Sequence, residues 1–94
     1  MMRGLENFLS RFPDDATSWS DATDELPDMY AWLAEELYLA PIGRRNCPTP
    51  AIWNQKYKAA IRDSVKLLDE DQKAGFEARF EHWFTSEEIS AGIL

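Results

Sequence analysis

The chain has 94 residues, a length that fits one domain with a modest core. Hydrophobic residues make up 45% of it and aromatic residues 13%, so a small helical core can be stable without covalent staples. The net charge of −7 disfavours a role on nucleic-acid backbones, and the single cysteine excludes an intrachain disulfide and a cysteine-based zinc site.

Apolar residues at three- and four-residue steps predict a first helix over about residues 2–12. Pro13 ends it, because the residue before a proline disfavours the helical region. Residues 13–26 are rich in Asp, Ser and Thr, which favour turns, and we predict a long acidic loop there. Trp19 is the only large apolar residue of this loop before Leu26. It either pins the loop to the core or anchors a partner.

A second helix is predicted over about residues 27–39, with Pro27 in its first turn and Pro41 beyond its end. Trp32 and Tyr38 lie off its main apolar stripe. The apolar surface is therefore too wide for one neighbour, so this helix is either central in the bundle or part of an interface.

Residues 41–49 are a connector rich in Pro, Gly and Arg, which breaks both helix and strand. Its Arg44 and Arg45 either bind an anion or belong to a solvated or salt-bridged loop. Thr49 is a good N-cap for a third helix over residues 50–68. The predicted inner face of this helix carries Trp53, Tyr57, Ala60, Ile61, Ser64, Val65 and Leu68.

The predicted outer face of the third helix carries a basic stripe at steps of four, Lys58, Arg62 and Lys66. Three interpretations remain open. The cations pair with acids of the same domain, contact an acidic partner protein, or contact nucleic acid.

Two capping-box patterns predict a helix over residues 70–84 and a short helical tail over 86–92. No segment shows the alternation of a strand. We therefore predict an all-α fold, a small four-helix bundle-like domain with a short C-terminal helical tail, in a single domain spanning 1–94. The capping patterns are Asp69 with Gln72, and Thr85 with Glu88.

Catalytic chemistry finds little support. His82 is the only histidine, and Cys47, although near arginines, lacks a partnering base and an oxyanion site. We expect no catalytic residues, no metal site and no cofactor. No stretch is apolar enough for a signal peptide or a membrane span, so we expect a cytoplasmic protein.

The charge is acidic, then basic, then acidic: −7 over residues 1–40, +5 over 41–66 and −5 over 67–94. Our leading hypothesis is a small acidic, non-enzymatic protein–protein interaction module: an inhibitor, adaptor or immunity-type factor that occupies a partner protein. The alternative is a nucleic-acid-associated or DNA-mimicking regulator. The candidate partner-binding residues are Trp19, Trp32, Tyr38, Arg44, Arg45, Lys58, Arg62 and Lys66.

The chain ends on two large apolar residues, Ile93 and Leu94. They either close the bundle or dock on a second copy, with exposed aromatic residues adding to the contact. Homodimerisation is therefore a further expectation.

Overall fold

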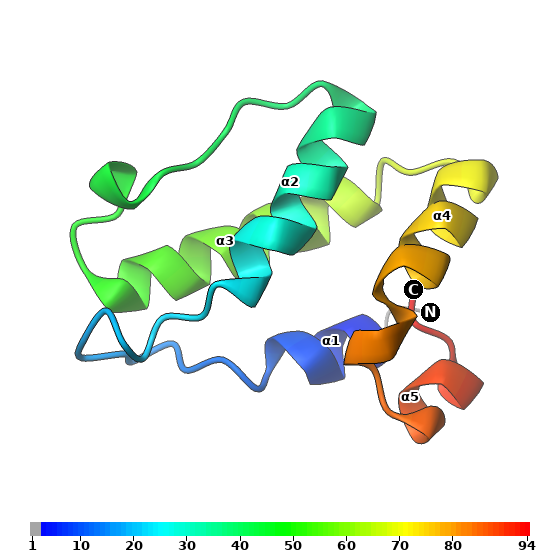
Figure 1. Ribbon diagram of the computed structural model, residues 1–94, viewed down its shortest axis with the longest axis horizontal. Coiled ribbons are helices and arrows are strands. Elements are labelled where there is room, and N and C mark those ends of the chain that lie inside the picture. Colours follow the sequence, from blue (N-terminus) through cyan, green and yellow to red (C-terminus); the bar gives the residue numbers. More distant parts are fainter. Residues whose placement is uncertain (1–2) are drawn as a thin grey trace. The chain divides into compact units, whose positions relative to one another are not determined.

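Helices make up the ordered elements of the computed structural model, which describes residues 3–94 (Figure 1). These residues contain no β-strand, which confirms the predicted all-α class, and their helices are consistent with a small helical bundle. Among them, no helix has both the length and the apolar character needed to cross a membrane. The elements are α1 (Arg3–Leu9), α2 (Glu25–Leu37), η1 (Arg44–Asn46), α3 (Pro50–Val65), α4 (Glu70–Phe80), η2 (Glu81–Trp83) and α5 (Ser86–Ala91).

The first two helices differ from the prediction at their ends. Residue 2, where the first helix was predicted to begin, lies outside the described residues. The last turn of α1 is tightened by the Arg11 amide, which donates to the Phe8 carbonyl at 3.1 Å. In α2, Pro27 is the third residue of the helix, where an amide N–H is not needed for the helical ladder.

The contacts of the chain divide it into two compact units. The terminal unit consists of the N-terminal segment up to Arg11 together with Leu68–Leu94, and the central unit is Phe12–Leu67. The two units are described separately below, and the assignment of one domain to residues 1–94 stays a prediction.

The core of the central unit forms where α2 packs against α3. Thr49 caps α3 as predicted, since its side chain accepts the Ile52 amide, and Pro50 occupies the first turn. Burial of each large apolar side chain contributes roughly 1.5–3 kcal/mol to stability. The buried residues recur at helical spacing and are Leu26, Met29, Tyr30 and Leu33 on α2, and Trp53, Tyr57, Ile61 and Val65 on α3.

Polar side chains of α3 hold the start of the long loop. Asn54 is fully buried and donates to the Pro13 carbonyl at 2.9 Å. Lys58 is also buried, and its ammonium donates to the Phe12 carbonyl and, at 2.8 Å, to the Asp14 carboxylate. The predicted outer-face position of Lys58 is therefore wrong. The acidic loop covers this side of α3 and uses the lysine to satisfy its own backbone.

The terminal unit brings the two ends of the described chain together, with α1 beside α5 (Figure 1). The amides of Gly4 and Leu5 donate to the carbonyls of Gly92 and Ile93 at 3.1 and 2.9 Å, which satisfies two donors of the first turn of α1. A Cβ atom on Gly4 would lie 3.0 Å from both the Gly92 oxygen and the Ile93 Cα. A larger residue at position 4 would therefore crowd the backbone of Gly92 and Ile93.

Aromatic side chains fill the core of the terminal unit. Phe8 and Phe80 are buried, and Phe8 stacks on Trp83 with ring centroids 5.6 Å apart and an angle of 7° between the planes. The predicted helix over 70–84 is interrupted after Phe80. The chain continues as η2 and then becomes extended at Phe84, from where Thr85 caps α5. Both predicted capping boxes, at Asp69 and at Thr85, are confirmed.

Glu88 is the charged centre of the terminal unit. Its side chain is only 5% exposed, and its Oε1 accepts from the Arg11 guanidinium and, at 2.7 Å, from the Thr85 amide. Burial raises the pKa of Glu88, but the hydrogen bonds from Thr85 and Arg11 outweigh burial and hold this pKa below its ordinary value. Glu88 is consequently a carboxylate at neutral pH.

Candidate partner-binding surface

All eight residues predicted to bind a partner belong to the central unit. The structure brings two of them, Trp19 and Arg44, into one cluster together with Trp53. The other six are distributed over α2, α3 and the connector, and they differ widely in exposure.

The cluster is a guanidinium held against two indole rings. The Arg44 Cζ lies 5.3 Å from the ring centroid of Trp19 and 5.0 Å from that of Trp53. The two rings meet edge to face at 6.2 Å. Trp53 is buried, whereas Trp19 is 39% exposed and the Arg44 side chain 47% exposed. We name Trp19, Arg44 and Trp53 the indole–guanidinium cluster.

Local structure explains why Arg44 reaches this position. The turn η1 is closed by the Cys47 amide, which donates to the Arg44 carbonyl at 2.9 Å. Cys47 itself is fully buried and fixes the connector to the core. From this turn, Arg44 also forms an ion pair with Asp24 at 3.2 Å. Cation–π contact at a partly exposed site contributes about 0.5–1 kcal/mol per ring, so the guanidinium is ordered before any partner binds.

The surroundings of the cluster are acidic. The long loop and the first turn of α2 carry six exposed carboxylates within the central unit. At neutral pH they give this stretch a strongly negative surface. Two of the charges are compensated by ion pairs, that of Asp14 by Lys58 and that of Asp24 by Arg44. The six are Asp14, Asp15, Asp21, Asp24, Glu25 and Asp28.

A groove of about 330 Å³ lies beside the same aromatic core. Tyr57 contacts the Trp53 ring at 4.5 Å and the Tyr30 ring at 5.7 Å, so the aromatic row runs from the cluster to the groove. The Tyr30 and Tyr57 hydroxyls donate to the carbonyls of Ala40 and Ile42, which fixes the connector as one wall. Burial, with the neighbouring Cys47 and Tyr30 groups, raises the pKa of Tyr57, so this hydroxyl remains a donor. The lining residues are Pro27, Tyr30, Ala31, Ala34, Glu35, Leu39, Pro41, Ile42 and Tyr57.

Tyr38 stands out by its backbone and its exposure. It caps α2 in the left-handed conformation with φ 57°, where glycine is preferred, and its side chain is 95% exposed. Strained residues that also expose a large aromatic ring are candidates for function. The role of Tyr38 in binding stays a prediction.

The basic stripe does not form one surface. Lys58 is buried against the acidic loop, Arg62 is half-buried, and Lys66 is exposed at the C-cap of α3. Lys58 therefore follows the first of the three interpretations, pairing inside the chain. Arg45 is exposed and Trp32 is half-buried on α2.

Some contributors were missed from the sequence. Asp24 orders Arg44, and Asn54 fixes the loop. Asn54 precedes Lys58 by four residues and lies next to the predicted inner face, so this polar pair beside an apolar stripe was an available signal. No sequence signal identified Asp24 as the partner of Arg44, because the loop contains many acidic residues.

The apolar C-terminus contributes to its own unit. Ile93 is buried, and Leu94 is half-buried.

Within residues 3–94, no group of three or more His, Cys, Asp or Glu side chains is placed to hold a metal ion. Comparisons with protein-family models, with curated proteins and with solved structures found no match to this chain.

Proposed function

We propose that this protein is a small non-enzymatic interaction module that binds a partner protein through its central unit. An inhibitor, an adaptor and an immunity-type factor all act in this way. The observation that carries the proposal is the indole–guanidinium cluster, in which Trp19 and Arg44 are ordered and yet partly exposed.

The residue types fit a binding anchor. Trp, Tyr and Arg dominate the energetics of protein interfaces. Arg44 is already held by two rings and by Asp24, so its immobilisation on binding costs less entropy than that of a free arginine. Tyr38 offers a further exposed ring.

The charge of the surface favours a basic partner. Six exposed carboxylates over residues 14–28 favour a basic protein face, which they attract by electrostatic steering. The groove accepts an apolar side chain, because its walls are formed largely by Pro, Ala, Leu, Ile and Tyr. The proposed occupant is a basic segment that presents one large apolar residue.

Direct contact with nucleic acid receives less support from these side chains. Lys58 is buried on Asp14, and Arg44 is paired with Asp24, so two of the cations available for phosphates are engaged. DNA mimicry is a special case of our proposal, in which the basic partner is itself a nucleic-acid-binding protein.

Affinity capture from the native host tests the proposal, with the full chain and its variants as bait. We expect one basic protein to be retained by the wild type and lost with Trp19→Ala and with Arg44→Ala. The matched control is Leu67→Ala, which removes an exposed apolar side chain elsewhere in the central unit. The proposal would be contradicted if all four baits retained the same proteins, or if the wild type retained no protein even at low salt.

A further inference from the structure

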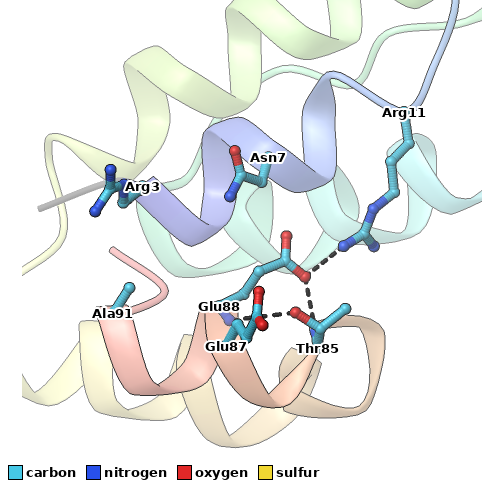
Figure 2. Close-up of a pocket in the computed structure, with 7 residues that line it drawn as sticks. All are labelled: Arg3, Asn7, Arg11, Thr85, Glu87, Glu88 and Ala91. Atoms are coloured by element: carbon cyan, nitrogen blue, oxygen red, sulfur yellow. Dashed lines mark hydrogen bonds and ion pairs between the residues drawn. The ribbon is translucent and has the colours of Figure 1, made fainter.

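A polar pocket of about 520 Å³ lies in the terminal unit, between α1 and α5 (Figure 2). This volume is in the range of small-molecule sites. None of the residues that line it is part of the proposed partner-binding surface. They are Arg3, Asn7, Arg11, Thr85, Glu87, Glu88 and Ala91.

One buried oxygen in this pocket lacks a hydrogen-bond partner. Oε1 of Glu88 is saturated by Arg11 and the Thr85 amide, but no donor among the described residues bonds Oε2. Figure 2 shows that this second oxygen points toward α1, on the side where Asn7 and Arg11 lie. An ionised carboxylate only accepts hydrogen bonds, and an unmet buried acceptor is costly. This oxygen can therefore accept a further hydrogen bond.

The charges around this oxygen indicate which charges a ligand would carry. Besides the Arg11–Glu88 pair, the lining holds one cation, Arg3, and one anion, Glu87. Arg3 begins α1, which rises roughly 9 Å to Leu9 at 1.5 Å per residue, whereas Arg11 lies beyond the opposite end of the helix. Because Arg11 compensates the charge of Glu88, the remaining charges of the lining are the negative Glu87, next to Glu88 in the sequence, and the positive Arg3.

We propose that this pocket binds a small zwitterion of amino-acid to dipeptide size. Its ammonium group donates to Glu88 Oε2 with support from Glu87, and its carboxylate pairs with Arg3. An ammonium supplies up to three donors, which matches two neighbouring carboxylates. A carboxylate and a guanidinium form strong charge-assisted hydrogen bonds.

Access to the oxygen requires a small movement at the pocket floor. Oε2 exposes less than 1 Å² of its surface. Asn7 is an exposed lining residue of α1, and its side chain stands over this part of the pocket in Figure 2. We expect rotation of the Asn7 side chain to open the path by which the ammonium reaches Glu88.

The test is a titration of the full chain with L-alanyl-L-alanine, in which the NMR chemical shifts of the backbone amides of pocket residues are measured. We expect saturable shifts at Asn7, Thr85 and Glu88, with a Kd of about 1 mM or tighter. N-acetyl-alanyl-alanine lacks the ammonium, and alanyl-alanine amide lacks the carboxylate. Both are expected to bind about tenfold more weakly or worse. Equal binding of all three probes, or no saturation by the dipeptide, would overturn the proposal.

Variants test the two ends of the site. Glu88→Gln keeps the capping-box pattern with Thr85 but replaces one carboxylate oxygen by a donor, so dipeptide binding is expected to fall about tenfold or more. Arg3→Ala changes an exposed residue and is expected to weaken the dipeptide but not alanyl-alanine amide. Glu77→Gln on α4 is the matched control and leaves the affinity unchanged. Wild-type affinity in both pocket variants would contradict the assignment, whichever result the partner capture gives.

Discussion

Replacement of Lys58 by methionine tests the way in which the acidic loop is held. The side chain of Lys58 is 5% exposed, and its ammonium serves the Phe12 carbonyl and the Asp14 carboxylate. An orphaned buried carbonyl costs about 1–3 kcal/mol. The Asp14 side chain is 65% exposed and regains water, so loss of this ion pair adds only about 0–1 kcal/mol. We therefore expect Lys58→Met to lower the free energy of unfolding by about 1–4 kcal/mol.

Urea unfolding at neutral pH measures this loss, and Asp14→Asn separates its two parts. We expect Asp14→Asn to cost at most about 1 kcal/mol, because the Phe12 carbonyl keeps its donor. Lys66→Met removes an exposed charge from the same helix and is expected to change stability by less than about 0.5 kcal/mol. If Lys58→Met destabilises no more than Lys66→Met does, the lysine is not the anchor of the loop, and the reasoning is refuted.

Three further predictions concern stability. Gly4→Ala places a Cβ against the backbone of Gly92 and Ile93, so urea unfolding is expected to show a loss of about 1–3 kcal/mol; an unchanged midpoint would contradict the close approach. Tyr38→Gly relieves the left-handed strain and is expected to gain about 1 kcal/mol while it weakens partner binding; lower stability would remove the argument from strain. The pKa of Glu88 lies below its ordinary value of 4.5, so its ionised form stabilises the fold at higher pH, and that contribution is lost as the pH falls through the lowered pKa. The free energy of unfolding is therefore expected to fall less steeply with decreasing pH in Glu88→Gln than in the wild type. The same pH dependence in both proteins would count against this role.

Local chemistry made the helices predictable. The caps at Thr49, Asp69 and Thr85 each depend on a few adjacent residues, and all three are present in the structure. Helix ends were harder to place where distant residues decide them. The interruption after Phe80, for example, accompanies a stack of Trp83 on Phe8, a residue more than seventy positions away.

The candidate site was predictable only in part. Trp19 was recognised as an isolated large apolar residue in a polar loop, and Arg44 as a cation in a connector. Their meeting over Trp53 depends on tertiary folding and has no signature in the sequence. Helical spacing placed Lys58 on the outer face, but spacing does not reveal that a loop covers that face.

The small polar pocket could not have been found from periodicity. Thr85 and Glu88 were recognised as a cap, and the cap exists. Arg11, from the opposite end of the sequence, adds an ion pair to this cap and leaves one buried oxygen of Glu88 without a hydrogen bond.

The central claim, that Trp19 and Arg44 anchor a partner protein, is tested most directly by the affinity of the captured partner for purified variants. Isothermal titration calorimetry gives the Kd for the wild type, Trp19→Ala and Leu67→Ala. Loss of an interface anchor costs about 2 kcal/mol or more, so we expect Trp19→Ala to raise the Kd roughly 30-fold and Leu67→Ala to leave it nearly unchanged. A Kd for Trp19→Ala equal to that of the wild type would contradict the account.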